Sequence, residues 1–420
     1  MKPAPPLTPT DSHPPKVSVI IPARNEEANL GRCLRSVLAQ QGIAFQVIVV
    51  DDHSADRTAF IARQIIQEFS VTDVAAPNLD GGPYLPAVGK CGKSASVDKY
   101  GTGTPKPPAI VIEARRPLPA GWTGKANALC TALPHAQTEW LLFTDADTEH
   151  APGSLAAAVQ EAERHRADLF SLSPEQEVSG FWERALMPVV FSELATTFRP
   201  QDVSDPAKPI AAANGQYLLI RRAVYEAVGG HAAVAADLLE DVALARRVKA
   251  AGHALRFRLG EGMVRTRMYR GLPQMREGWT KNLALLFPDA DALACRRLAE
   301  FAALIALPPV TAAAWRNRIL PSGKISPSGK NNRALRYGLL AASAAVWGNF
   351  LRRTRKAHFD PLSTALAFCG LPLFARLLAR SARAHRDGQV QWKGRNYCIS
   401  PASAKIEGHA PTKSSVEPTR

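Results

Sequence analysis

Apolar residues follow two different spacings along the first third of the chain, and the two spacings alternate. Lys16–Ile21 (KVSVII) and Gln46–Val50 (QVIVV) are short β-branched runs, which predict strands. Glu26–Gln40, between them, places its apolar residues at helical spacing, and Asp56–Phe69 repeats that pattern after the second strand. The order strand, helix, strand, helix predicts a parallel sheet whose two faces are covered by helices.

The same order resumes further along the chain and brings acidic residues to the strand ends. Ala109–Glu113 and Glu139–Phe143 predict two more strands, and Lys125–Leu133 predicts the helix between them. Ligands of open α/β sheets bind at the carboxyl ends of the strands. We therefore expect the acidic residues that follow the second and fourth strands to converge in one crevice. They are Asp51, Asp52, Asp145 and Asp147.

Three other parts of the chain differ from this pattern in composition. Residues 1–16 are polar and rich in proline, so we expect a disordered leader, no cleavable signal peptide and a catalytic part in the cytosol. Residues 77–108 are rich in Gly, Pro, Ser and Lys, which predicts an inserted surface loop. Residues 398–420 are expected to form a disordered tail.

Three apolar stretches beyond Met268 are long enough to enter a bilayer. They are Leu298–Trp315, Ala334–Leu351 and Pro361–Ala379. Charged residues lie inside them or near their ends, namely Glu300, Arg336 and Arg376. Residues 288–397 are therefore predicted to form a membrane-associated helical region, whose helices span the bilayer or lie at its interface. The alternative is a soluble helical subdomain.

The chain is strongly basic. Its 420 residues carry a formal charge of +15, which favours anionic partners: nucleotide phosphates, acidic lipid headgroups or nucleic acid. Hydrophobic residues make up 46% of the chain, so a disordered protein is excluded. The six cysteines are scattered without a CxxC pair, which indicates neither a zinc site nor a disulfide framework and fits a reducing cytoplasm.

Two acidic pairs have a spacing that suits chemistry. Asp145 and Asp147 are two residues apart at a strand end, where both carboxylates reach one hard cation that also binds diphosphate oxygens. The alternative is an acidic turn that caps the next helix. Glu240 and Asp241 precede a helical pattern, where Asp241 serves either as a general base for an acceptor hydroxyl or as a helix cap.

Lys125 follows a glycine-bearing segment, Gly121–Gly124, at the start of the third predicted helix. Glycines at a helix N-terminus let backbone amides approach a phosphate, and the lysine supplies a positive charge. The alternative is an ordinary helix start with a solvated lysine. The residues alone leave both interpretations open.

Four pieces occur in a fixed order: PARNEE from Pro22, VDDHSAD from Val50, TDAD from Thr144 and LEDVAL from Leu239. Together they resemble glycosyltransferase family 2, over roughly residues 17–287. The resemblance implies an α/β fold of the GT-A type, a nucleotide-diphospho-sugar transferase domain over these residues, followed by the C-terminal membrane-associated helices. It also implies a reaction that inverts the anomeric centre in one displacement.

The resemblance assigns the donor site to residues of the first loop and of the strand ends. These donor-binding residues are Pro22, Ala23, Arg24, Glu26, Asp51, Asp52, Lys125 and Asp145. Asp52 is expected to meet the nucleotide base, with Asp51 beside it, and Lys125 matches the GK element of the family. Asp147, with Asp145, is expected to hold Mn²⁺ or Mg²⁺. Asp241 is the expected general base, with Glu240 adjacent.

The run Gln274–Asn282 lies where polymerising members of the family carry QxxRW. Here the third and fourth residues after Gln274 are Glu277 and Gly278, so a polymerising synthase is not expected. The GWTKNL run instead resembles members that glycosylate polyisoprenoid lipids such as carotenoid acids or hopanoids. Residues expected on the acceptor or diphosphate side are Gly215, Gln216, Arg267 and Trp279. The alternative for Trp279 is packing in the core of an amphipathic helix.

The resemblance, together with the apolar C-terminal stretches, implies an inverting glycosyltransferase at the inner membrane, with its catalytic domain on the cytoplasmic side. It moves a sugar from a nucleotide-diphosphate donor to a lipid acceptor of polyisoprenoid type. Alternatives are a glycosyltransferase for a cell-envelope polysaccharide and a nucleotidyltransferase, whose glycine-rich loop is missing from PARNEE. Nucleic acid is not expected as a partner, because no aromatic or basic stripe indicates base stacking.

Overall fold

The computed structural model describes residues 14–71, 107–316 and 329–398 of the chain. The predicted leader 1–16, the insertion 77–108 and the tail 398–420 lie almost wholly outside the described residues. These three assignments therefore stay predictions.

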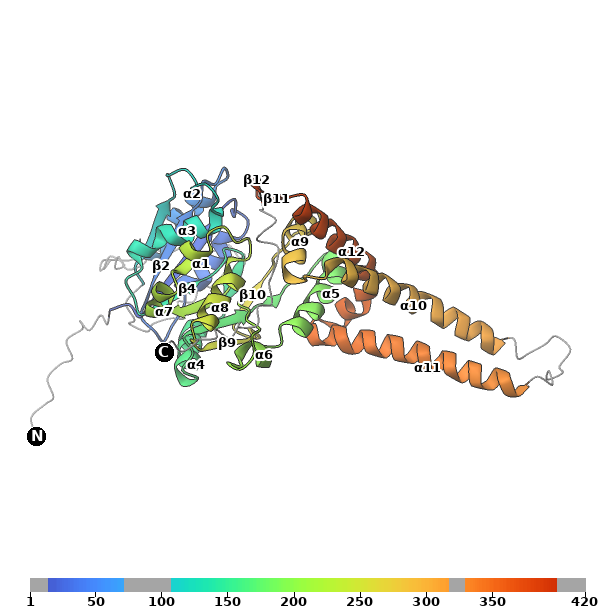
Figure 1. The fold of residues 1–420 in the computed structure, drawn as a ribbon. Helices are drawn as coiled ribbons and strands as arrows, with labels where there is room; N and C mark the ends of the chain where they lie inside the picture. Colours follow the sequence, from blue (N-terminus) through green and yellow to red (C-terminus); the bar gives the residue numbers. More distant parts are fainter. Residues whose placement is uncertain (1–13, 72–106, 317–328, 399–420) are drawn as a thin grey trace, which may run out of the picture.

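A seven-stranded sheet forms the centre of the N-terminal half (Figure 1). Its strands, in spatial order, are β3 (Ala109–Glu113), β2 (Phe45–Asp51), β1 (Val17–Ala23), β4 (Trp140–Phe143), β8 (Leu218–Arg221), β6 (Leu169–Ser173) and β9 (Leu255–Leu259). The first four run parallel, as the sequence predicts, whereas β8 is antiparallel to both β4 and β6. The predicted α/β class is therefore confirmed; the sequence also predicts a strand at Tyr217–Ile220, which corresponds to β8, but not its antiparallel direction.

Helices cover both faces of this sheet and form two cores. Successive residues of a strand point to opposite faces, so Val19 and Ile21 of β1 pack in one core and Ile20 packs in the other. The first core includes buried residues of α1 (Leu30–Leu38), α2 (Thr58–Val71) and α4 (Ser154–Arg164). The second includes α3 (Gly124–Ala132), α7 (Arg222–Ala227) and α8 (Glu240–Ala250). The predicted helices on residues 26–40, 56–69 and 125–133 correspond to α1, α2 and α3.

β1 runs through Pro22 to Ala23, two residues beyond the end of the predicted strand Lys16–Ile21. Proline lacks the N–H that a central strand donates. The pairing of β4 with β1 stops at Ile20, so the end of β1 has a sheet neighbour only in β2. Pro22 is therefore tolerated in the last two residues of the strand, which open the crevice.

A small three-stranded sheet, in the order β5 (Thr148–His150), β10 (Val264–Thr266), β7 (Glu175–Gln176), lies directly after β4. It tethers the acidic turn that joins β4 to β5. The Thr148 hydroxyl donates to the carbonyl oxygen of Asp145 at 2.8 Å, and the Thr266 hydroxyl donates to that of Asp147 at 3.1 Å. The backbone of the turn is thus held by hydrogen bonds from β5 on one side and from β10 on the other.

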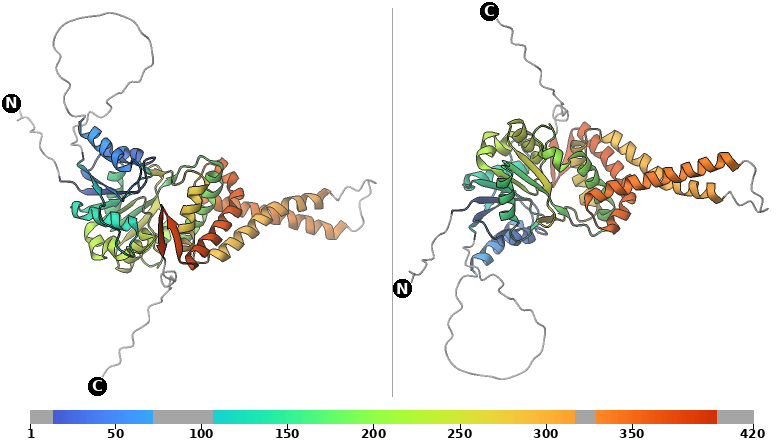
Figure 2. Two further views of the ribbon diagram at one scale, coloured as in Figure 1. Left: turned by 90° about the horizontal axis from the view of Figure 1, so that it is seen from above. Right: turned by 90° about the horizontal axis from the view of Figure 1, so that it is seen from below.

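The C-terminal half is helical and has its own core (Figures 1 and 2). Its main helices are α5 (Phe181–Thr197), α9 (Leu272–Leu286), α10 (Ala290–Arg316), α11 (Gly329–Thr354) and α12 (Pro361–Arg386). Parts of α10 and α11 project from the body as an antiparallel pair, here called the arm. Shorter elements are α6 (Pro200–Ser204), η1 (Leu133–His135), η2 (Gly230–Val234), η3 (Arg355–Ala357), β11 (Gln389–Trp392) and β12 (Arg395–Cys398).

Two helices of the described chain are long and apolar enough to cross a membrane, α10 and α12. The sequence predicts three such stretches, and the one on α11 does not meet this criterion, because asparagine, arginine, serine and glycine interrupt its apolar residues. The most apolar window of α12 is 50% buried inside the protein, whereas that of α10 is only 11% buried. α12 is therefore also a core helix, whereas most of the apolar window of α10 is exposed.

Four charged residues form a buried quartet where the arm meets the body. Glu300 accepts ion pairs from Arg297 at 2.5 Å and from Arg353 at 2.7 Å. Glu193 of α5 pairs with the same two arginines at 3.1 and 3.2 Å. Each side chain is at most 15% exposed, so Glu300, which interrupts the first apolar stretch, is neutralised by two arginines.

One glycine, Gly370, lets the backbones of α5 and α12 approach closely. A Cβ at Gly370 would overlap the backbone of Ala185 and Leu186. We expect Gly370→Ala to lower the free energy of unfolding by about 1–3 kcal/mol, as overpacking against rigid backbone does. The measurement is thermal or denaturant unfolding. The matched control is Gly338→Ala in α11, where a Cβ meets no heavy atom within 4 Å; equal effects of the two substitutions would contradict this contact.

Candidate active site

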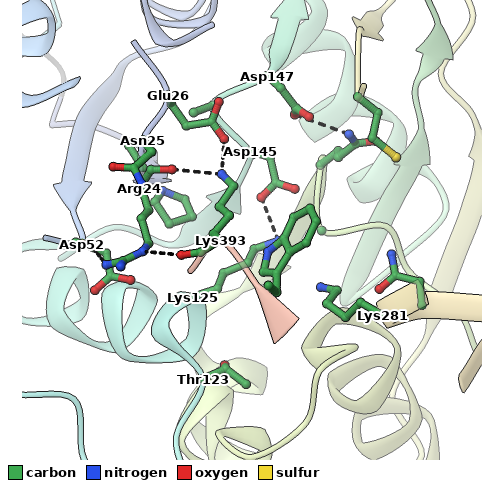
Figure 3. Close-up of a pocket in the computed structure, with 18 of the residues that line it drawn as sticks. Arg24, Asn25, Glu26, Asp52, Thr123, Lys125, Asp145, Asp147, Lys281 and Lys393 are labelled. Carbon is green, nitrogen blue, oxygen red and sulfur yellow. Dashed lines mark hydrogen bonds and ion pairs between the residues drawn. The ribbon is translucent and has the colours of Figure 1, made fainter. Parts of the chain in front are cut away.

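A cavity of about 430 Å³ opens at the carboxyl ends of β1, β2 and β4 (Figure 3). It is here called the donor pocket. The expected site residues that line it are Pro22, Ala23, Arg24, Glu26, Asp52, Lys125, Asp145, Asp147, Gly215, Gln216, Glu240 and Asp241. Asp51 does not line it, because its carboxylate is buried and accepts the backbone N–H of Ser54 at 3.3 Å. Asp51 thus holds the turn after β2, next to the pocket.

The loop after β1 is fastened to the end of β2. The Arg24 guanidinium donates to the carbonyl oxygen of Asp52 at 2.7 Å, and the backbone N–H of Glu26 donates to the Thr58 hydroxyl at 2.8 Å. Asn25, between them, has a φ of 52°, a left-handed conformation that asparagine tolerates. The loop therefore presents the Glu26 side chain and its own backbone to the pocket.

Lys125 lies at the centre of the pocket, in the first turn of α3, whose N-cap is the Thr123 hydroxyl. Its ammonium lies 2.7 Å from Asp145 and 2.9 Å from Glu240. Burial alone would lower the pKa of Lys125, but these carboxylates outweigh burial and raise it well above its usual value. Burial alone would raise the pKa of Glu240, but the nearby charges of Lys125 and Lys281 outweigh burial and lower the pKa of Glu240. Both groups are held in their charged forms.

Asp241 is the second residue of α8. Its carboxylate accepts the backbone N–H of Gly215 at 2.7 Å and that of Val242 at 2.8 Å. Burial, followed by the neighbouring charge of Glu240, raises the pKa of Asp241 to about 6. The Asp241 side chain therefore accepts hydrogen bonds from backbone N–H groups at a helix N-terminus and also lines the pocket. A role as helix cap and a role as general base are compatible with this position.

Asp147 and Asp145 both face the donor pocket (Figure 3). Burial, and then the charges of Asp145 and Glu26, raise the pKa of Asp147 to about 7. A cation would relieve this repulsion, and carboxylate oxygens are the donors that Mg²⁺ and Mn²⁺ take. Within the described residues, no three His, Cys, Asp or Glu side chains are arranged as a metal cluster. The residues fit a cation held by two carboxylates that draws its other ligands from water or a diphosphate.

A second cavity of about 920 Å³ meets the donor pocket and is mostly apolar at its wall. We call it the acceptor cavity. The residues common to both cavities are Asn214, Leu239, Asp241, Met268 and Asn282. From this junction the cavity extends between α5 and α9, past Phe191, Leu194 and Trp279, to the segment between α11 and α12. Asp241 is therefore the carboxylate at the point where the two spaces join.

Two expected site residues lie away from the donor pocket. Arg267 pairs with Glu183 at 3.4 Å and donates to the Ser179 hydroxyl. Its guanidinium therefore links the end of β10 to α5. Trp279 is buried in the core of α9 and also lines the acceptor cavity. Trp279 therefore has the helix-core position that was the alternative, at the wall of the second cavity.

Among the donor-pocket residues that the sequence analysis missed are Lys281, Trp392, Lys393, Arg395 and Tyr397. Four of them belong to β11, β12 and their turn, which the sequence analysis included in the helical region that ends at residue 397. The missed signal is a short alternating stretch around a Lys-Gly dipeptide, QVQWKGRNYC, which is typical of a two-residue hairpin.

The sequence profile described as "Glycosyl transferase family 2" matches residues 18–81 and 115–229. These ranges contain the first loop, Asp52, Lys125, the acidic turn and Gly215, all around the donor pocket. The chain is a glycosyltransferase whose matched residues resemble family 2. The family likeness therefore coincides with many of the pocket residues, whereas Glu240, Asp241 and the helical half apart from α5 lie outside the matched ranges.

This glycosyltransferase is similar to two bacterial proteins described as 4,4'-diaponeurosporenoate glycosyltransferase. The one from Staphylococcus aureus (strain MRSA252) is 25% identical over 401 residues, which covers 91% of this chain and 88% of that protein. The one from Staphylococcus haemolyticus (strain JCSC1435) is 29% identical over 278 residues, covering 64% and 61%. The first similarity extends through the helical half of the chain.

Two solved structures are also similar. The mannosyltransferase PcManGT from Pyrobaculum calidifontis, in complex with GDP-Man and Mn²⁺, has a TM-score of 0.48 at 19% identity, over 90% of this chain and 89% of that one. TarS 1–349 of S. aureus, in complex with UDP-GlcNAc, has a TM-score of 0.37 at 13% identity, over 91% and 99%.

The ion pairs of Lys125 lead to a stability prediction. Lys125→Met leaves the carboxylates of Asp145 and Glu240 without their nearest cation, and we expect it to lower the free energy of unfolding by about 1–3 kcal/mol, discounted for partial exposure. Lys208→Met, which removes an exposed pair with Asp202, is the control and should leave stability unchanged. Thermal unfolding at pH 7 checks both. Equal stability of the Lys125 variant and the wild type would contradict the central role of Lys125.

Proposed function

We propose that this glycosyltransferase moves a sugar from a nucleotide-diphosphate donor to the hydroxyl of a lipid acceptor at the membrane, with inversion at the anomeric carbon. The observation that carries the proposal is the junction of a charged pocket and a larger, mostly apolar cavity at one carboxylate, Asp241. A donor in the first space and an acceptor in the second would meet at that group.

The donor pocket has the charges that a nucleoside diphosphate requires. Lys125 and Lys281 line it together with Arg24, so cations are available to phosphate oxygens. Asp147, with Asp145, would hold Mn²⁺ or Mg²⁺, which when bound neutralises charge on the departing diphosphate. Asp52, at the end of β2, is the proposed contact of the nucleotide base, as in the family that the chain resembles.

Asp241 is the proposed general base. A hydroxyl is a weak nucleophile, so its proton must move to a nearby base as its oxygen attacks the anomeric carbon and the bond to the diphosphate breaks. The Gly215 and Val242 N–H groups orient the Asp241 carboxylate, and Glu240 next to it is already paired with Lys125. Asp241 is thus the carboxylate of this pair with no ion pair to a cation among the described residues.

The acceptor cavity supports an apolar acceptor. Phe191, Leu194 and Trp279 line it, and a mostly apolar wall gains free energy when a hydrocarbon chain replaces water. The S. aureus and S. haemolyticus relatives are described as acting on 4,4'-diaponeurosporenoate, whose name denotes a carboxylate and not a hydroxyl, so they support the apolar chain of the acceptor and not its reacting group. A polyisoprenoid lipid whose polar end reaches Asp241 fits both observations better than an envelope polysaccharide does.

The arm supports delivery of that acceptor from a membrane. Apolar side chains of α10 and α11 are exposed on it, among them Ile305, Val310 and Leu335. The segment that follows α11, Lys356–Asp360, lines the far end of the acceptor cavity. A lipid could therefore pass from a bilayer around the arm into the cavity. We propose an inner-membrane location with the catalytic half in the cytoplasm, where nucleotide sugars are made.

Asp241→Asn tests the base. Because an amide cannot take the proton, we expect transfer to fall by roughly 10²–10⁴-fold while the Kd of a nucleoside diphosphate stays unchanged. With a pKa of about 6, Asp241 is the active carboxylate above that pH, so wild-type transfer should fall as the pH drops below about 6. Asp291→Asn, on an exposed carboxylate paired with Arg386, is the control. Normal turnover by Asp241→Asn would contradict the mechanism.

Ala195→Trp tests the acceptor cavity. Ala195 lines the cavity on α5, and an indole there would fill part of the space for the acceptor chain. We expect the KM for a polyisoprenoid alcohol in detergent to rise at least tenfold, with nucleotide Kd unchanged. Ala223→Trp on the exposed side of α7 is the control. Unchanged lipid kinetics, or transfer only to water-soluble glycans, would overturn the lipid acceptor.

A further inference from the structure

The C-terminal hairpin β11–β12 returns from the helical half to the donor pocket. β11 and β12 pair from Gln389 with Cys398 to Trp392 with Arg395. The two turn residues, Lys393 and Gly394, have φ values of 46° and 72°, as a tight two-residue hairpin turn requires. Val390 is buried, so the hairpin is anchored at its base, and its tip lines the pocket (Figure 3).

Arg395 of this hairpin binds the carboxylate of Asp52. Its guanidinium donates to both carboxylate oxygens, at 2.5 and 3.0 Å, and the Asp52 side chain is only 5% exposed. The close approach requires Gly124, since a Cβ there would overlap the guanidinium. A bidentate arginine leaves few free lone pairs on Asp52 for another donor group.

Lys393 occupies the neighbouring part of the pocket. Its ammonium pairs with Glu26 and donates to the carbonyl oxygen of Arg24 at 3.0 Å, and its own backbone N–H donates to Glu277 at 2.8 Å. Figure 3 shows this ammonium among Arg24, Glu26 and Asp145. The hairpin thus supplies a cation to the first loop and another to the carboxylate after β2, the two places where the nucleotide is proposed to bind.

We propose that the β11–β12 hairpin is a plug of the donor pocket: Arg395 and Lys393 bind the donor-site carboxylates when no nucleotide is present, and the nucleotide must displace them. The inference rests on the proposed donor site. Displacement is expected because a nucleotide base that hydrogen-bonds to Asp52 needs the carboxylate oxygens that Arg395 already binds. The competing possibility, that both cations are ligands of the bound diphosphate, predicts the opposite effect of their removal.

The experiment measures nucleotide affinity. Arg395→Gln and Lys393→Gln are each titrated in the full-length protein with UDP and with GDP in the presence of Mn²⁺, by calorimetry. We expect the Kd for the nucleotide that binds to fall by roughly tenfold, the order of magnitude of one charged hydrogen-bonded contact. Gln391→Ala, exposed on β11, is the matched control and should keep the wild-type Kd.

A higher Kd in both variants would overturn the plug and make the two cations donor ligands, and an unchanged Kd would also overturn it. Failure of the wild type and of every variant to bind either nucleotide would instead overturn the proposed donor site itself. Hydrogen exchange of the wild type gives a second readout: saturating nucleotide should speed exchange of the amides in residues 389–398. Slower exchange there would overturn the displacement.

Discussion

One lysine connects the two halves of the active site. The Lys125 ammonium bridges Asp145, at the end of β4, and Glu240, at the start of α8. Four carboxylates line the same pocket on these elements, and without a shared cation their charges would repel one another and their pKa values would rise. The turn that would hold a metal and the helix that carries Asp241 are therefore held at one edge of the sheet by the same charge.

The donor pocket was largely predictable because local patterns determine it. Parallel strands end at one edge, so the acidic residues after β2 and β4 had to lie near each other once the alternation of strands and helices was recognised. Asp51 shows the limit of that argument. It is adjacent to Asp52, yet the pleat turns successive side chains in different directions, and Asp51 bonds to the turn instead of lining the pocket.

Features made by long-range packing were not predictable in the same way. The acceptor cavity combines α5, α9 and the segment before α12, whose sequence patterns do not indicate their mutual position. Hydropathy alone also could not separate α12, which packs much of its apolar surface against α5 and α9, from a helix that faces lipid. The hairpin escaped notice because only the fold brings residues near 395 to Asp52.

The charged quartet has a consequence for how deeply the protein can sink into a lipid layer. Moving Glu193, Arg297, Glu300 and Arg353 into hydrocarbon would cost several kcal/mol even when they are paired. If the arm enters a bilayer, the part that lies in hydrocarbon therefore ends at the charged quartet. Lys356–Asp360 begins three residues after Arg353, so the cavity entrance would stay at the headgroup level, where an amphiphile presents its polar end.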